Sequence, residues 1–332
     1  MIPSKKLTYS VLDLVPITEG TRAREAYENS IKLAQLTEKL GFHRYWIAEH
    51  HNMPGIASAA TSLVMSYIAS ATKTIRIGAG GIMLPNHAPL IVAEQFGTLE
   101  AMHPGRIDLG LGRAPGTDPL TAKALRRVQG SNGDDFPERL AELIEYLNND
   151  GEKAVRAIPE EGKNIPIWLL GSSDFSARLA GMLGLPFSFA SHFAPANTLP
   201  ALKIYRDFFK KSNILQEPHC MAAINVFASN THEQAEKMAT SSKLQFLSLI
   251  RGKPGKMKPP VDNIEDHWNE REKLAVLNQL SNTLIGTKED IKAGLEHFAN
   301  ITKANEIIVV CNAFHFEDRA KSYEILAEAM EI

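Results

Sequence analysis

The chain has 332 residues, of which 44% are hydrophobic and 22% charged, and its formal net charge at pH 7 is −2. This balance gives no electrostatic footprint for nucleic acid, and no apolar run approaches the roughly 18 residues of a membrane span. The apolar run at 7–14 is too short and too interrupted for a secretory signal, so we expect a cytoplasmic protein. Cys220 and Cys311 lie in separate apolar runs and are expected to be buried, reduced thiols.

Short strands alternate with helical patterns along the chain. Runs rich in β-branched and aromatic residues predict strands at 7–12, 45–48, 75–82, 106–110, 167–170, 187–190, 221–228 and 306–310. The first three repeat at about 30 residues, as βαβ units require. Eight strands, each followed by a helix, favour an α/β fold of the (β/α)8 TIM-barrel type rather than an open sheet. We therefore expect a single domain over 1–332.

Helical spacing of apolar residues predicts the intervening helices. They are expected at 22–40, 58–71, 88–102, 198–210, 233–250 and 317–330, with others ending near 147 and 183. Asp135 with Glu138, and Thr287 with Asp290, have the spacing of a capping box and mark two further helix starts.

The connection between the seventh and eighth strands is too long for a simple barrel unit. We interpret 229–285 as an insertion. Within it, the stretch 251–260 contains Pro and Gly, which forbid regular structure, and cations, which keep the chain solvated. Long loops of this kind often act as lids, so we predict that 251–271 closes over the site, with a solvated linker as the alternative.

The second strand ends in Glu49, His50 and His51, and barrel enzymes place their sites at such strand ends. Adjacent residues of a strand face opposite ways, so His50 and His51 could not both bind one metal ion without a sharp turn. No paired carboxylates complete a metal site, and we predict none. The alternative is a surface strand end with an incidental pair of histidines. We expect His51 to have a structural role and to face away from His50.

Two features indicate an anion site. Gly171, Ser172 and Ser173 open a helix, whose N-terminal N–H groups suit a phosphate, and Arg113 follows the fourth strand. Ordinary N-capping by the serines and a surface salt bridge for Arg113 are the alternatives. The run 110–116 is not a dinucleotide fingerprint, because its third glycine comes one residue late and a proline interrupts the helix start.

Glycines crowd the end of the third strand at positions 78, 80 and 81. Glycine weakens a strand unless a flat ligand approaches the backbone or the backbone takes an unusual geometry. A β-bulge or a barrel corner fits nearly as well.

These motifs, taken in order, resemble those of the bacterial luciferase-like flavin monooxygenase family over nearly the whole chain, and especially its single-component bacterial members rather than light-emitting luciferase. The matching stretches are 46–51, 77–85, 93–95, 104–113 and 169–173. The ordered series is specific to the family, whereas no single motif is.

The resemblance implies roles for individual residues. His50 would be the base near the reactive edge of the flavin, and Gly80–Gly81 a cis peptide behind its ring. The residues expected around the FMN phosphate are Arg113, Gly171, Ser172, Ser173 and Ser176. Gly112 stands where luciferase has a reactive cysteine and Ser172 where it has a glutamate, so aldehyde chemistry and light emission are not carried over.

The implied function is an FMN-dependent monooxygenase that receives reduced FMN from a separate flavin reductase. O2 would add to the flavin at C4a, and the peroxide would oxidise a small organic substrate. A deazaflavin (F420)-dependent hydride-transfer enzyme of the same fold and a non-catalytic flavin-binding protein remain alternatives. A homodimer is expected. The candidate pocket residues are mixed in polarity and do not identify the substrate: Met83, Asn86, His192, Phe193 and Trp268.

Overall fold

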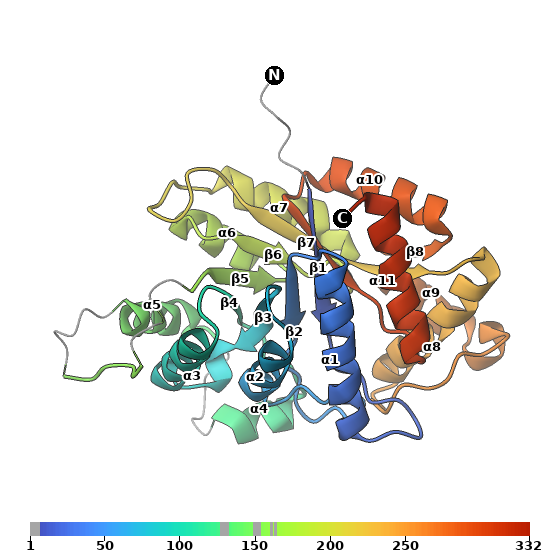
Figure 1. Cartoon of the computed structure of the whole chain (residues 1–332), viewed down its shortest axis with the longest axis horizontal. Helices are drawn as coiled ribbons and strands as arrows, with labels where there is room; N and C mark the ends of the chain where they lie inside the picture. Colours follow the sequence, from blue (N-terminus) through green and yellow to red (C-terminus); the bar gives the residue numbers. More distant parts are fainter. Residues whose placement is uncertain (1–6, 127–132, 149–153, 160–161, 163–164) are drawn as a thin grey trace.

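The structure, a computed structural model, describes residues 7–126, 133–148, 154–159, 162 and 165–332. Its strands are β1 (Thr8–Asp13), β2 (Arg44–Ile47), β3 (Arg76–Met83), β4 (Ile107–Gly112), β5 (Ile167–Gly171), β6 (Phe187–Phe189), β7 (Cys220–Ala228), β8 (Thr283–Gly286) and β9 (Glu306–Val310). All pairs are parallel in the order β6-β5-β4-β3-β2-β1-β9-β7, and β6 also pairs with β7, so that eight strands form a closed barrel (Figure 1). The predicted TIM barrel is confirmed, and every predicted strand agrees with the structure to within two residues at each end.

Helices surround the barrel. The α-helices are α1 (Ala23–Lys39), α2 (Thr61–Ala71), α3 (Pro89–Met102), α4 (Pro119–Arg126), α5 (Phe136–Leu147), α6 (Asp174–Leu183), α7 (Thr198–Asp207), α8 (His232–Ile250), α9 (Glu270–Gln279), α10 (Lys288–Thr302) and α11 (Phe316–Met330). Short 3-10 turns occupy Leu84–Asn86 (η1), Pro195–Asn197 (η3) and Ile264–His267 (η4). No helix of the described residues is long and apolar enough to cross a membrane.

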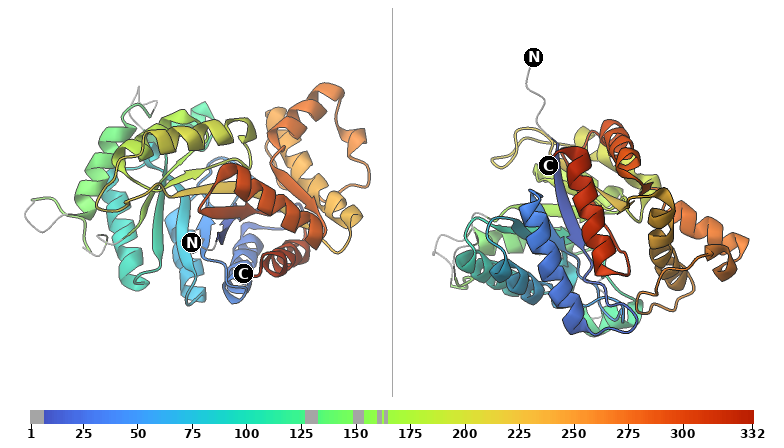
Figure 2. Two further views of the ribbon diagram at one scale, coloured as in Figure 1. Left: turned by 90° about the horizontal axis from the view of Figure 1, so that it is seen from above. Right: turned by 45° about the vertical axis from the view of Figure 1, so that its right-hand side comes forward.

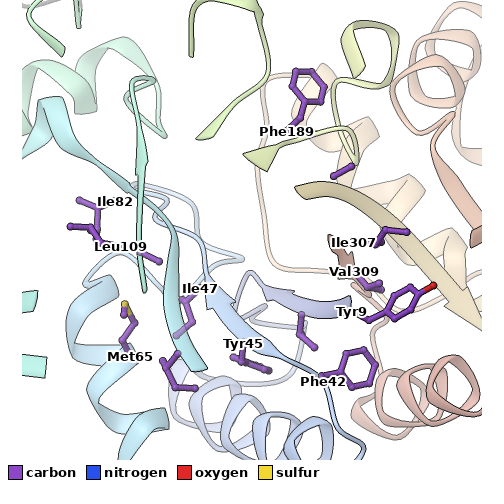
Figure 3. Close-up of a cluster of buried hydrophobic side chains, with 14 of the residues drawn as sticks. Tyr9, Phe42, Tyr45, Ile47, Met65, Ile82, Leu109, Phe189, Ile307 and Val309 are labelled. Carbon is purple, nitrogen blue, oxygen red and sulfur yellow. The ribbon is translucent and has the colours of Figure 1, made fainter. Parts of the chain in front are cut away.

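Residues of each strand alternate between two apolar layers, as the period of two demands. On β2, Tyr45 and Ile47 belong to the large layer between barrel and helices, part of which is drawn in Figure 3. Trp46 and Ala48 belong instead to a second cluster, with Leu12 and Trp168. Trp46 meets Trp168 edge to face at 5.4 Å, an arrangement worth about 1 kcal/mol beyond area burial.

Charged groups gather where β2 and β9 begin. Arg44, the first residue of β2, donates to Asp108 on β4 at 2.8 Å and to Glu306, the first residue of β9, at 2.9 Å. These buried charges satisfy one another, and Arg76 adds a further pair with Asp108 at 2.7 Å. The cluster joins four strands at their N-terminal ends, which leaves the C-terminal ends for the site.

The connection from β7 to β9 holds α8, η4, α9, β8 and α10. Helices α8 and α9 pack around a small core of their own, made of Leu244, Leu247, Val276 and Leu280, and lie to one side of the barrel (Figure 2). The chain between them returns to the barrel: Met257 donates to the carbonyl of Ile17 at 3.0 Å and accepts from Glu19 at 2.8 Å.

Some local predictions need correction. No helix or strand was predicted at α4, α9 or β8, although Asn269 and Glu272 form a capping box at the start of α9. Asp135 makes no cap hydrogen bond at α5, because its carboxylate pairs with Arg139 at 2.5 Å. The capping box predicted at Thr287 is confirmed. Both cysteines are free and buried, as predicted.

Candidate functional site

A cavity of about 750 Å³ lies between the C-terminal strand ends and the insertion. That volume is in the range of cofactor and ligand sites. The cavity brings together most of the predicted site residues: His50, Gly80, Met83, Arg113, Gly171, Ser172, Ser173, Ser176, His192 and Phe193. Helix α8 and the chain after it add Gln245, Phe246, Leu249 and Met257, and α9 adds Gln279, none of which the sequence analysis identified.

One end of the cavity combines a guanidinium group with the first turn of α6. Arg113 lies over the ring of Phe175 with its Cζ 4.1 Å from the centroid, a cation–π contact that holds it beside that turn. Ser173 is the N-cap residue of α6, but its side chain makes no cap hydrogen bond. The capping alternative therefore does not account for this hydroxyl. Backbone N–H groups, hydroxyls and a guanidinium at one helix start suit a phosphate.

Two neutral imidazoles line the cavity from opposite sides of the barrel. His50 follows β2, and its Nδ1 lies 3.4 Å from the carbonyl oxygen of Gly116. His192 follows β6, four strands from β2 in either direction around the barrel. Burial lowers the pKa of His50. Burial, and repulsion from the protonated form of His50, lower the pKa of His192 to about 3. Both side chains are therefore neutral near pH 7.

Within the part of the chain that the structure describes, two polar atoms of the cavity wall are buried and have no hydrogen-bond partner. They are Nδ1 of His192 and Oδ1 of Asn312, which follows β9. A buried polar atom without a partner is costly, so both atoms are suited to hydrogen-bond a bound molecule.

Beside His50, the carboxylate of Glu49 is 1% exposed. It accepts hydrogen bonds from Nε2 of His51 at 2.8 Å, from Nε2 of His87 at 2.9 Å and from the backbone of Met83 at 3.0 Å. Burial would raise the pKa of Glu49, but the hydrogen bonds from His51 and His87 outweigh it and hold the pKa at about 2. His51 thus serves the structure of the site, as its predicted role requires. No local sequence pattern points to this role of His87.

The Gly80–Gly81 peptide bond is cis, as predicted. A Cβ atom on Gly80 would lie 2.8 Å from Cδ1 of Leu12, and one on Gly81 would lie 2.6 Å from the carbonyl oxygen of Gly110. The pairing of β3 with β4 also shifts register between Ala79 and Ile82. At position 81, where the contact is with backbone, the packing of the barrel itself therefore requires glycine, which is the barrel-corner alternative; at position 80 the contact is with the flexible end of the Leu12 side chain.

Three predicted site residues do not line the cavity: Gly81, Asn86 and Trp268. The amide of Asn86 donates to the carbonyl of Pro115 at 2.9 Å, so it supports the loop after β4. Trp268 packs against the core between α8 and α9 and donates to Glu265 at 3.0 Å. The pocket assignment of Trp268 is wrong because the insertion has its own apolar core for this ring to cover.

The chain belongs to the luciferase-like monooxygenase family, which it matches over residues 7–303. It is 54% identical over 326 residues to the protein YvbT of Bacillus subtilis (strain 168), with 98% of this chain and 97% of the relative covered. A luciferase-like monooxygenase of Escherichia coli (strain K12) is 48% identical over 328 residues, covering 98% of each chain. Among solved structures, apo-MsnO8 has a TM-score of 0.88 at 31% identity and covers 98% of each chain.

More distant relatives have a named activity or ligand. The N-acetyl-S-alkylcysteine monooxygenase of Bacillus subtilis (strain 168) is 33% identical over 329 residues, covering 97% of each chain. The oxygenating constituent of 3,6-diketocamphane monooxygenase of Pseudomonas putida, in complex with FMN, has a TM-score of 0.71 at 17% identity and covers 98% of each chain. An F420-dependent secondary alcohol dehydrogenase has a TM-score of 0.68 at 17% identity, covering 98% of this chain and 99% of that one. The last two share the fold.

The buried Glu49 carboxylate predicts a pH dependence of stability. Its folded pKa of about 2 lies below the ordinary 4.5, so the unfolded chain binds more protons between these values. The stabilisation is fully present above about pH 4.5, roughly 3 kcal/mol by linkage, and is lost as the pH falls towards 2. In urea unfolding, the difference between the parent and Glu49→Gln should be large at pH 6 and shrink towards pH 3. The same substitution at the exposed Glu142 serves as the control, and a pH-independent difference at Glu49 would contradict the assignment.

Proposed function

We propose that the protein is an FMN-dependent monooxygenase that uses reduced FMN and O2 to oxidise a small organic molecule. The observation that carries this proposal is the end of the cavity where Arg113 lies beside the start of α6 and the Ser173 hydroxyl has no capping role. The FMN complex of a protein with the same fold supports it. When bound, reduced FMN supplies the electrons that activate O2.

The chain itself would bind, orient and exchange a proton. Arg113, Gly171, Ser172, Ser173 and Ser176 would hold the FMN phosphate at the start of α6. Gly80–Gly81, at the β3 end, would lie behind the flavin ring. His50, a neutral imidazole in the same cavity, can accept a proton during the reaction.

The second candidate is F420-dependent hydride transfer, which an F420-dependent alcohol dehydrogenase of the same fold keeps open. A flavin-binding protein without turnover is the third. Titration with oxidised FMN, reduced FMN and F420, followed by admission of oxygen and a panel of organic substrates, separates them. Oxygenated product with FMN supports the proposal. Binding of F420 alone supports the second candidate, and FMN binding without any product supports the third.

Two assignments accompany this function. A separate flavin reductase would deliver the reduced FMN, as suits a chain related in fold to an oxygenating constituent. The protein would be cytoplasmic. It would form a homodimer, because α2 and α3 expose the apolar side chains of Leu63, Tyr67, Ile91 and Met102. A solution mass equal to one chain would contradict the dimer.

Replacing Arg113 tests the phosphate assignment. A charge-assisted hydrogen bond to a partly buried group is worth roughly 1.5–3 kcal/mol. Arg113→Ala should therefore weaken FMN binding about tenfold or more and leave riboflavin, which has no phosphate, almost unchanged. The measurement is fluorescence titration of both ligands. Arg178→Ala, on the exposed side of α6 over Phe208, is the matched control, and equal losses for FMN and riboflavin would place Arg113 elsewhere.

Replacing His50 tests the proton-transfer role. His50→Ala should bind FMN like the parent but lose substrate oxidation by about a hundredfold or more, the contribution typical of general acid–base catalysis. FMN affinity and oxygenated product are measured side by side. His43→Ala, at the other end of β2 and exposed, should behave like the parent. Full product formation by His50→Ala would contradict the proton-transfer role of His50.

The lid prediction for 251–271 becomes specific at Met257. This residue is 3% exposed, lines the cavity and bonds through its backbone to the loop after β1. We expect that replacing 253–260 with a short Gly/Ser bridge leaves FMN binding intact but diverts oxygen use towards hydrogen peroxide, since water then enters the cavity. Met257→Leu, which keeps the bulk, is the control. The measurement is the yield of oxygenated product and of hydrogen peroxide. Unchanged yields in the shortened protein would identify the segment as a linker.

A further inference from the structure

The wall of the cavity contains few charges. Among the described residues that line it, Arg113 is the one permanent cation, and Glu49 and Asp134 are the carboxylates. Arg113 lies over Phe175 at the first turn of α6. The Glu49 oxygens are already occupied by His51, His87, Asn86 and the Met83 backbone. Once a phosphate occupies Arg113, no cation of this set remains to pair with a negatively charged second molecule.

Away from α6, three segments of the chain give the cavity an apolar wall. The loop after β1 contributes Leu14 and Pro16, the loop after β2 contributes Met53 and Ile56, and the insertion contributes Phe246, Leu249 and Met257. The backbone bonds between Met257 and the loop after β1 hold two of these segments against each other. Backbone hydrogen bonds within the fold therefore hold part of this apolar wall in place.

Apart from the exposed Asp134 carboxylate, the polar atoms that remain are uncharged. The amide nitrogen of Gln245 already donates to the carbonyl of Gly255 at 3.1 Å. The unpartnered atoms, Nδ1 of His192 and Oδ1 of Asn312, belong to an imidazole whose pKa is lowered by burial and to an amide. Such atoms hydrogen-bond neutral groups well, but they do not compensate a full negative charge removed from water.

We propose that the molecule oxidised in this cavity carries no negative charge and is largely apolar, and that carboxylate forms of otherwise acceptable molecules are rejected. The inference rests on the proposed function at one point, because it assigns Arg113 to the cofactor phosphate. It sets this chain apart from an enzyme for free N-acylated amino acids, which carry a carboxylate at neutral pH.

The test is a series of ligands of equal chain length with different end groups. Octanamide, 1-octanol and octanoate are titrated calorimetrically into FMN-loaded protein at pH 7.5. Octanamide and 1-octanol should bind, and octanoate should bind at least about tenfold more weakly, because its charge would lose hydration without gaining a partner. Octanoate binding as tight as octanamide, or no binding by any of the three, would overturn the proposal.

A substitution at Leu249 is expected to reduce the preference for octanamide over octanoate. It is 39% exposed at the end of α8 and lines the cavity, so an arginine there can reach both water and the ligand. Leu249→Arg should raise octanoate affinity about tenfold relative to the matched Leu249→Gln, while octanamide affinity changes equally in both. An unchanged octanoate affinity would contradict the wall assignment.

FMN affinity, measured first without octyl ligands, keeps the two proposals distinguishable. Failure to bind FMN counts against the proposed function, and the series is then run on protein loaded with F420, whose phosphate would occupy Arg113 in the same way. The preference for uncharged ligands is expected there as well. Octanoate binding to either loaded form, at the affinity of octanamide, counts against the inference alone.

Discussion

The arrangement of the site depends on one buried carboxylate. Glu49 lies two residues after the end of β2, and its oxygens accept hydrogen bonds from His51 further along the same loop, from the end of β3 and from His87 ahead of α3. An ionised carboxylate with 1% exposure is stable only with such donors, so the three segments are held in one arrangement. His50 lies between Glu49 and His51 in the chain, and the bond between its neighbours leaves it on the wall of the cavity.

A second group of buried charges acts at the other end of the strands. Arg44, Asp108 and Glu306 join β2, β4 and β9 where these strands begin. The same strand, β2, thus carries an ion pair at its first residue and is followed closely by the buried Glu49 carboxylate. Between them lies Trp46, 1% exposed, against the ring of Trp168. The short β2 is fixed at both ends, which gives His50 a rigid support.

Secondary structure could be predicted from the sequence where a periodic pattern of apolar residues reflects burial. Tyr45 and Trp46 alternate between two apolar layers, and that alternation made β2 and the other barrel strands predictable. The site residues at strand ends followed from the barrel geometry and the resemblance. What could not be predicted depends on tertiary contacts. β8 exists because it pairs with the end of β7, Trp268 covers a core that forms only when α8 meets α9, and His87 gains its role from Glu49.

The pairing of β7 with β8 brings the two ends of the insertion close together. β7 pairs with β6 and β9 through its first residues, while Asn225–Ala228 pair with Thr283–Gly286. The chain therefore leaves the barrel at Ala228 and returns beside it, with Ala228 opposite Gly286. A segment whose two ends are adjacent can be exchanged between homologues as a cassette, because any replacement that spans the same short gap leaves the barrel register unchanged. The insertion can therefore change in sequence and length without any change in the eight-stranded barrel.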